Sequence, residues 1–441
     1  MKKLLLLSTC IAAIVLPAHG ANWLKLQGTE PEGAGGRAKV WGFIQPEYVR
    51  TDDTKLKAGP YAGQKAVFNQ NRPDDQADEF NIRRARIGVR GTPFPLDPKI
   101  NYFILAEFGN NGITKNGGGS VKVTDASVTL NHIDGARFRV GQFKYPGSEE
   151  GLRAIHVANY TSFSEPVNQL LLERFVDAQS TGGAGTDISG ANADTFIGLN
   201  GPVGAFRDIG VQIFDTFEQE NGWEYSYAAM IGNGNGITRG DNNDDKDFYT
   251  YLAAEKVYGG KGARREHLKA YVWNHSGKRT LDVAGVETDF DRDRRGIGVI
   301  YDKGKYSFGA EYIDADGMIF NGTSAGAVPG SISNNGNARA DFNVQGEGEA
   351  DGYYLHFGYD VTPSVELDLR YESLDRLTNS VGGEREFRTT TIGAQYFFNK
   401  KSRFTINYAF RDIDAPGGNA TAKSILSGVD DKLTAQLLFI F

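Results

Sequence analysis

Arginines recur at close, regular spacing in two short stretches of the chain. The first stretch holds Arg84, Arg86 and Arg90, and the second holds Arg137 and Arg139. A guanidinium group stays charged and presents a planar fork of donors that fits carboxylate and phosphate oxygens. Because side chains alternate between the two faces of a β-strand, residues at even spacing share one face. The two stretches therefore predict two rows of cations that face polar solutes or anions.

Carboxylates occupy the polar face of later strand-like segments. They are Glu311, Asp360, Glu366, Asp368 and Glu372, while Glu107 lies among the basic stretches. In a ring of strands, the segments that carry this acidic group would lie opposite the arginines. We expect a transverse field across a bore, which orients polar solutes rather than filtering one sign of ion.

Motifs for catalysis or metal binding do not stand out. The chain has no Gly-x-Ser-x-Gly elbow and no His-Glu-x-x-His pair, and its six histidines are scattered without metal-site spacing. We expect no catalytic residue, no metal site and no cofactor. An outer-membrane β-barrel hydrolase remains an alternative, in which His156 or His356 would meet a serine and a polar partner on one face.

Apolar and polar residues alternate with a period of two in sixteen segments of the sequence, each about ten residues long. Leu433, Ala435, Leu437, Phe439 and Phe441 share one face of the last segment. Short and long connections alternate between the segments without a break. This pattern predicts a closed 16-stranded antiparallel transmembrane β-barrel over residues 40–441, with both termini at the periplasmic end.

One segment breaks the alternation. Phe80 and Ile82 fall on the lipid face, and so do Ala85 and Ile87, but the step from Ile82 to Ala85 is three residues. One extra residue at Arg83-Arg84, a β-bulge, restores the phase and turns Arg84 toward the bore.

Both ends of the chain indicate export. Residues 1–20 have a basic head, an apolar run from Leu4 to Leu16 and small residues at a cleavage site, as in a signal peptide. Residues 21–39 are expected to form a short periplasmic leader. The terminal Phe441 is expected to be read by the barrel-assembly machinery, and the chain to reside in the lipid of the bacterial outer membrane.

The composition narrows the class of protein further. The formal net charge of −7 becomes −9 when Lys2 and Lys3 leave with the signal peptide, which argues against nucleic acid as a partner. The single cysteine would leave too. With 56 glycines, the chain suits strands and turns. An exported soluble carbohydrate-binding β-sandwich is the alternative that has the same periodicity with its apolar face inward.

The long connection 145–205 carries too many apolar residues for a solvated loop. We expect it to fold into the lumen and narrow the bore as a constriction loop. A cap packed on neighbouring loops is the alternative. Its candidate solute contacts are Arg153, His156 and Arg174, accompanied by Glu149, Glu150, Glu165, Glu173 and Asp177, so the loop lacks a strong basic bias.

Three stretches resemble a known family. Residues 81–91, 101–109 and 139–144 are similar to the first third of the phosphate-selective porin O and P family. The resemblance implies a sixteen-stranded homotrimeric barrel with a ladder of pore-wall arginines, here Arg84, Arg86, Arg90, Arg137 and Arg139. It also implies an outer-membrane channel for passive diffusion of small hydrophilic solutes, with a preference for anions or phosphate. The mixed charges of the constriction loop depart from the family pattern.

Overall fold

The fold is taken from a computed structural model, which describes residues 22–26, 29, 38–51, 54–55, 57–58, 62–63, 77–92, 97–114, 121–173, 204–237, 241, 243–260, 265–283, 286–320, 331–334, 337–340, 344–417 and 420–441. The expected signal peptide and residues 174–203 of the expected constriction loop lie outside these ranges. Within them, no helix has the length and apolar character needed to traverse a bilayer.

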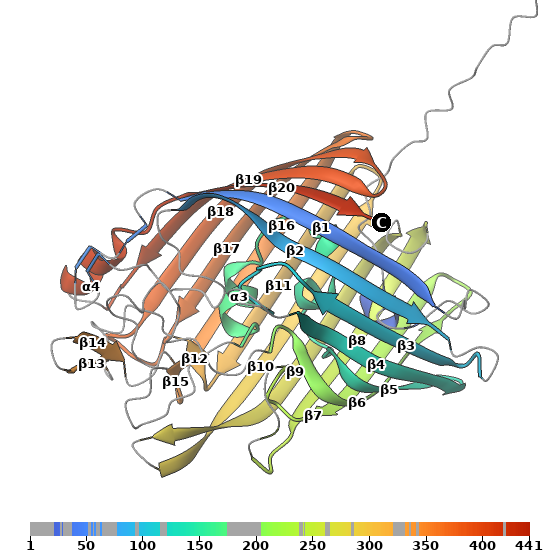
Figure 1. Cartoon of the computed structure of the whole chain (residues 1–441), viewed down its shortest axis with the longest axis horizontal. Helices are drawn as coiled ribbons and strands as arrows, with labels where there is room; N and C mark the ends of the chain where they lie inside the picture. Colours follow the sequence, from blue (N-terminus) through green and yellow to red (C-terminus); the bar gives the residue numbers. More distant parts are fainter. Residues whose placement is uncertain are drawn as a thin grey trace, which may run out of the picture.

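Sixteen antiparallel strands form one closed barrel, which confirms the predicted fold class (Figure 1). Each strand pairs with its neighbours in chain order, and the first pairs with the last. The barrel strands are β1 (Lys39–Thr51), β2 (Ala77–Gly91), β3 (Ile100–Glu107), β4 (Lys122–Ile133), β5 (Ala136–Lys144), β6 (Arg207–Glu218), β7 (Trp223–Gly232), β8 (Asp247–Gly259), β9 (Glu266–Val283), β10 (Val286–Lys303), β11 (Tyr306–Asp316), β16 (Glu349–Thr362), β17 (Val365–Arg376), β18 (Arg385–Asn399), β19 (Ser402–Asp414) and β20 (Lys432–Ile440).

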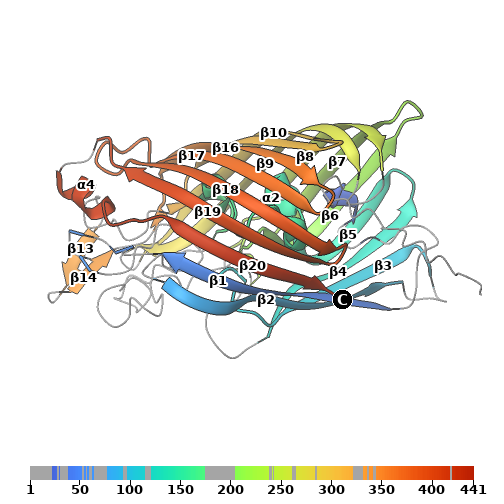
Figure 2. The ribbon, with the colours of Figure 1, turned by 90° about the horizontal axis from the view of Figure 1, so that it is seen from above.

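The remaining described elements are short. Two small two-stranded sheets pair β12 (Ile319–Phe320) with β15 (Val344–Gln345) and β13 (Ser331–Asn334) with β14 (Asn337–Ala340). The helical elements are α1 (Trp23–Leu26), α2 (Glu149–Leu152), the 3-10 turn η1 (Ile155–Val157), α3 (Glu165–Leu170) and α4 (Ala420–Leu426). Helices α2 and α3 lie inside the ring of strands (Figures 1 and 2).

The two faces of the wall differ in polarity in the sense that a membrane requires. Leu367 and Leu369 on β17 are 49% and 46% exposed, whereas Glu366 and Arg370 on the same strand are 1% and 3% exposed. Phe439 on β20 is 51% exposed. Apolar side chains thus face outward and charged ones inward, which is the reverse of a soluble sandwich.

The bulge lies where the broken alternation predicts it. Gln45 on β1 pairs with Arg84 and the next residue, Pro46, pairs with Ile82, so Arg83 is the extra residue. Arg83 and Arg84 are both buried inside the barrel. Pro46, which has no N–H to donate, sits at the irregular pair, where a ladder hydrogen bond is already interrupted.

Tight turns gather at one end of the barrel and longer connections at the other. Two residues separate β10 from β11, β16 from β17 and β18 from β19, and the C-terminus lies at the same end (Figure 1). We call this the turn end and the opposite one the loop end. In outer-membrane barrels the short turns face the periplasm. The predicted alternation of short and long connections fails between β9 and β10, which pair out to Val283 and Val286 and leave two residues between them at the loop end.

Gly42 lies at the pairing that joins the first strand to the last. The backbone nitrogen of Phe441 donates to the Gly42 oxygen at 3.0 Å, and Gly42 nitrogen donates to Phe441 oxygen at 3.2 Å. A Cβ on Gly42 would lie 2.4 Å from Cζ of Phe441 and 2.5 Å from the backbone oxygen of Arg86. Only glycine lets the Phe441 ring cover the ladder at this point.

A Gly42→Val substitution should therefore hinder closure of the barrel. Overpacking that the backbone cannot relieve destabilises by about 1–3 kcal/mol or more, and the clash falls on the pairing that closes the barrel. The measurement is the fraction of heat-modifiable barrel on an unheated gel. Gly259→Val is the matched control, because a Cβ there meets nothing within 4 Å. Equal folding of the two variants would contradict this role of Gly42.

Candidate functional site

The connection after β5 enters the barrel and crosses its lumen. Residues 145–173 run through α2, η1 and α3, and Val167, Leu170, Leu171 and Leu172 are each at most 1% exposed. These apolar side chains lie within a polar lumen. They therefore have to be covered by the segment itself and by the aromatic side chains of the wall. We call residues 145–173 the crossing segment.

The first part of the crossing segment is fixed by buried polar contacts. Glu149 accepts hydrogen bonds from the Tyr251 hydroxyl, at 2.5 Å, and from the Lys269 ammonium group. Lys144 Nζ donates to the carbonyl oxygens of Gly151 and Arg153 at 2.7 and 2.8 Å. A cation at the carboxyl end of a helical turn satisfies carbonyl groups that have no partner within the turn.

The middle part of the crossing segment reaches the opposite wall. Asn159 Nδ2 donates to Glu366 at 3.0 Å and to Asp368 at 2.8 Å, both on β17. The hydroxyl groups of Thr161 and Thr434, on β20, lie 2.6 Å apart. These contacts join segments more than 200 residues apart in sequence and hold the crossing segment against the wall.

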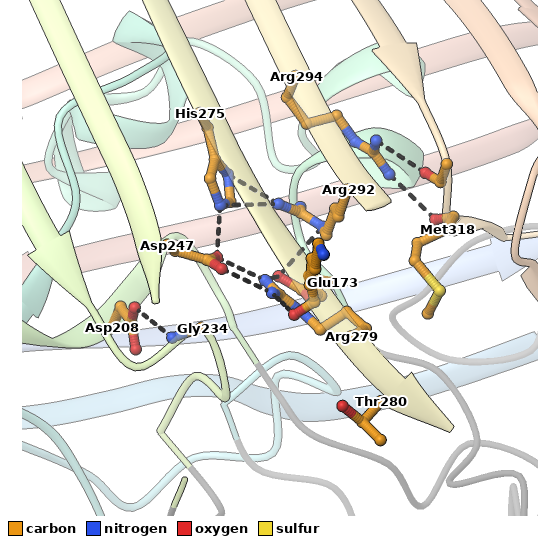
Figure 3. Close-up of polar contacts among 12 residues, drawn as sticks. Glu173, Asp208, Gly234, Asp247, His275, Arg279, Thr280, Arg292, Arg294 and Met318 are labelled. Carbon is orange, nitrogen blue, oxygen red and sulfur yellow. Dashed lines mark hydrogen bonds and ion pairs between the residues drawn. The ribbon is translucent and has the colours of Figure 1, made fainter. Parts of the chain in front are cut away.

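Charged residues fasten the end of the crossing segment to β8, β9 and β10 (Figure 3). Glu173 accepts hydrogen bonds from Arg279 and lies 3.3 Å from Arg292. Arg279 Nη2 also donates to Asp247 at 2.7 Å, and His275 Nε2 lies 2.6 Å from the same carboxylate. We call these five residues, with Arg294, the loop latch.

The loop latch is closely packed, and its three guanidinium groups surround two carboxylates. Arg294 Nε donates to the Leu170 oxygen at 3.0 Å and Nη2 donates to the Met318 oxygen at 3.0 Å. A Cβ on Gly277 would lie 1.7 Å from Asp247 Oδ1, so a glycine is required there. Burial alone would raise the pKa of Glu173, but the guanidinium groups of Arg279 and Arg292 outweigh it and hold the pKa below its ordinary value.

Two cavities flank the crossing segment. One, of about 50 Å³, is lined toward the turn end by Ile300, Asp302 and Phe308. The other, of about 60 Å³, is lined toward the loop end by Thr389, Arg411 and Lys432. Four residues line both cavities, namely Tyr160, Ser162, Phe163 and Arg370. These four residues, which we call the shared lining, stand where a solute would pass from one cavity to the other.

Arg370 is the charged member of the shared lining. Its guanidinium carbon lies 4.2 Å from the centre of the Tyr160 ring. Its Nε donates to Glu372 at 2.6 Å, and Nη1 donates to Glu150 at 3.2 Å and to the Ser162 oxygen at 3.1 Å. Bonds to both the wall and the crossing segment keep the cation in one orientation.

The arginines predicted from the sequence lie on the inward faces of β2 and β5, and each has a partner. Arg84 donates to Gln45 at 3.3 Å, Arg86 to Glu107 at 2.7 Å, and Arg139 to Thr129 at 3.3 Å. Arg137 pairs with Asp215 at 3.1 Å. Arg90 donates to the backbone oxygens of Leu26 and Thr29.

Five of the six predicted carboxylates are at most 5% exposed on inward faces, namely Glu107, Glu311, Glu366, Asp368 and Glu372, whereas Asp360 is half-buried. Glu107 is bound to Arg86, Glu372 to Arg370, and Glu366 with Asp368 to Asn159. Glu311 lies beneath the crossing segment, where it accepts hydrogen bonds from Ser148, Trp273 and Tyr354 at 2.7–3.0 Å.

The three predicted loop residues differ in position. Arg153 lines the cavity nearer the turn end and donates to Asn159 at 3.3 Å. His156 packs against Trp41 and Phe43, with ring centres 5.8 and 5.1 Å away, and burial lowers its pKa to about 3. A neutral imidazole among aromatic rings supports packing rather than ion binding. Arg174 falls outside the described residues.

The histidine nearest a serine does not form a hydrolytic triad. His356 Nε2 lies 3.1 Å from Ser307 Oγ, but its Nδ1 faces the Tyr160 hydroxyl at 2.8 Å instead of a carboxylate. A triad needs an acidic partner to stabilise the imidazolium. Among the described residues, no three His, Cys, Asp or Glu side chains are placed to hold a metal ion.

Sequence reasoning missed several residues of the site. Arg370 has the same even spacing as its acidic neighbours on β17. This spacing predicts an inward side chain but not a position between the two cavities. Tyr160, Lys144 and the loop latch depend on contacts between distant segments. No local pattern distinguishes them from other lumen residues.

Comparisons with known proteins give a family and a fold. Residues 55–425 match the family model described as "Phosphate-selective porin O and P". No curated protein sequence matches. The family match agrees with the resemblance seen in three stretches of the sequence and extends it over most of the chain.

Two solved structures share the architecture. OmpF of Salmonella typhi, in complex with daunomycin, superposes with a TM-score of 0.55 at 13% identity, covering 94% of this chain and 100% of that chain. The trimer form of OmpT of Vibrio cholerae superposes with a TM-score of 0.50 at 12% identity, covering 92% and 99%. At these identities the likeness concerns the fold.

The loop latch predicts a specific effect of Glu173→Gln. Removal of one partner from a buried ion pair costs about 3 kcal/mol, so the crossing segment should loosen while the barrel stays closed. The expected results are faster proteolysis of the segment in the folded channel and larger fluctuations of the open-channel current. Asp314→Asn removes an exposed pair with Arg295 and should change neither. A Glu173→Gln channel whose current fluctuations and rate of proteolysis equal those of the wild type would rule out the loop latch.

The same latch predicts a dependence on pH. Because the folded pKa of Glu173 is below its unfolded value, its stabilisation is complete above the ordinary glutamate pKa and is lost as pH falls through the lowered pKa. Current fluctuations in the wild type should therefore stay constant from neutral pH down to about the ordinary glutamate pKa near 4.3 and rise only below it. A rise that begins above that value would contradict the lowered pKa.

Proposed function

This chain belongs to the phosphate-selective porin O and P family and is therefore an outer-membrane channel rather than an enzyme, and we propose that small anions pass it in preference to cations. Porins let small solutes diffuse through a water-filled bore without cofactor or turnover. The finer proposal concerns the route and the selectivity. The route runs along the crossing segment, from the cavity at the loop end to the cavity at the turn end.

One observation carries this proposal, namely that the two cavities share Arg370 and Tyr160. A solute that moves between the cavities meets a fixed guanidinium group beside a ring face. Arg370 supports passage of anions because its donors suit carboxylate and phosphate oxygens. Glu372 and Glu150, bound to the same guanidinium, keep the binding weak enough for release.

The charge on the two walls supports a transverse field. Strands β1–β5 and their bulge carry five buried cations against three buried carboxylates: Arg83, Arg84, Arg86, Arg139 and Lys144 against Glu47, Glu107 and Asp125. The wall opposite, β11 to β17, carries four buried carboxylates against two buried cations: Glu311, Glu366, Asp368 and Glu372 against Arg370 and Arg376. We assign the predicted arginines and carboxylates to pore walls that orient a dipolar solute, with Arg153 at the cavity nearer the turn end.

Export and assembly are part of the proposal. We propose that residues 1–20 are a cleaved signal peptide and that the barrel-assembly machinery reads Phe441 in the outer membrane. Phe441 remains 44% exposed at the seam of the closed barrel. A homotrimer is proposed by analogy with the Vibrio cholerae porin, which is described as a trimer.

The role of Arg370 predicts the outcome of Arg370→Gln. Loss of one charge about 5 Å from a passing ion is worth roughly 0.8 kcal/mol in water, with opposite sign for an anion and a cation, so the anion-to-cation permeability ratio should fall by roughly tenfold or more. The measurement is the reversal potential of single channels in a salt gradient. Arg388→Gln is the matched control, because Arg388 lies on the outward face of β18 beside Asp375 and Glu386. The same ratio in both variants would contradict the proposed route.

The basic wall predicts a second shift. The double variant Arg84→Ala with Arg137→Ala removes two inward cations and should lower the anion-to-cation ratio in the same assay, with a larger effect at low salt because screening is weaker. The control Arg295→Ala removes one cation whose side chain is 69% exposed, and it should leave the ratio unchanged. An unaltered ratio in the double variant would remove the basic wall from the account of selectivity.

A further inference from the structure

A second part of the chain also lies inside the barrel, at the turn end. Helix α1 (Trp23–Leu26) belongs to the expected periplasmic leader, yet its Leu24 side chain is 1% exposed. Asn22 Nδ2 donates to the hydroxyl groups of Thr216 on β6 and Ser226 on β7, at 3.1 Å each. The short dark-blue coil beside β6 in Figure 2 is this segment.

The segment is also tied to the wall through charged side chains. Lys25 Nζ pairs with Glu218 at 2.7 Å, near the tight turn between β6 and β7. Across the lumen opening, Arg90 near the end of β2 donates to the backbone oxygens of Leu26 at 3.4 Å and Thr29 at 2.5 Å. Residues 22–26 and 29 therefore bridge β2 to β6 and β7.

The position of the segment places it in series with the crossing segment. Its partners Thr216, Glu218 and Ser226 adjoin a turn-end hairpin, and α1 contacts α2 of the crossing segment. A solute that leaves the cavity at the turn end has to pass this level before it reaches the periplasm. The segment also covers Arg90, one of the cations on the basic wall.

The attachment is of a kind that can be released. Residues 22–26 and 29 take no part in the barrel ladder, whose order runs from β1 to β20 without them. Among the described residues they are held by buried Leu24, by Trp23 packed against the same apolar cluster, and by the polar contacts of Asn22, Lys25 and Arg90. Because the attachment consists of few contacts, the segment can detach locally while the barrel remains closed.

We propose that residues 22–26 and 29 form an inner plug, which restricts the periplasmic mouth while docked and exposes Arg90 to the bore when it detaches. The inner plug is a second resistance to flow, in addition to the passage beside Arg370. Its detachment raises conductance and adds one cation to the wall. This goes beyond the proposed function, because it concerns total current and not only the choice of ion.

The test makes detachment reversible within one protein. The triple variant Asn22→Cys, Leu24→Asn, Ser226→Cys, with Cys10→Ser, removes the buried leucine and supplies two thiols at positions whose side chains touch in the wild type. A short bis-methanethiosulfonate cross-linker joins the thiols, and a reductant frees them. Heat-modifiable mobility on a gel verifies that both forms are closed barrels.

If the inner plug and the crossing passage have comparable resistances in series, reduction of the cross-linked triple variant should raise single-channel conductance about twofold. The cross-linked form should keep the wild-type value. The anion-to-cation ratio should rise together with conductance, and adding Arg90→Gln should cancel that rise but not the gain in conductance. Equal conductance of the cross-linked and reduced forms would overturn the inner plug, whatever the selectivity of the channel.

Discussion

The structure depends on one constraint, which is that no backbone N–H or C=O group can remain unpaired in hydrocarbon. An open sheet would leave two unpaired edges in the membrane, so the first and last strands have to meet. They do so through the ladder between β1 and β20, which ends in reciprocal bonds between Gly42 and Phe441. Closure then fixes the polarity of the wall, since each strand presents alternate residues to lipid and to the lumen.

A closed barrel with charged side chains inside creates a second requirement. Each buried charge needs a partner, because an unpaired one is strongly unfavourable. Here the partners come from neighbouring strands, as in Arg86 with Glu107, and from the crossing segment, as in Glu173 with Arg279. The same charges that could select a solute thus also hold the crossing segment in place. Arg370 combines the two roles, since it binds wall and segment and lines both cavities.

The sequence predicts what depends on local periodicity. The barrel, its strand number, the lipid-facing residues and the bulge beside Arg84 all follow from alternation with a period of two. Contacts between distant segments do not follow from it. The pattern that places Glu311 and Arg370 on inward faces is the same, yet one lies beneath the crossing segment and the other beside the cavities. The docking of Leu24 could not be predicted, because a four-residue helix carries no periodic signal.

The central claim is that solutes pass between the crossing segment and the wall, beside Arg370. The most direct measurement is the accessibility of a single cysteine at Ser162, which lines both cavities. In a Ser162→Cys channel with Cys10→Ser, an anionic methanethiosulfonate reagent should react from either side of the membrane and lower the current in steps, whereas Leu252→Cys on the lipid face should give no step. A Ser162→Cys channel that keeps its full current after the same treatment would contradict the claim.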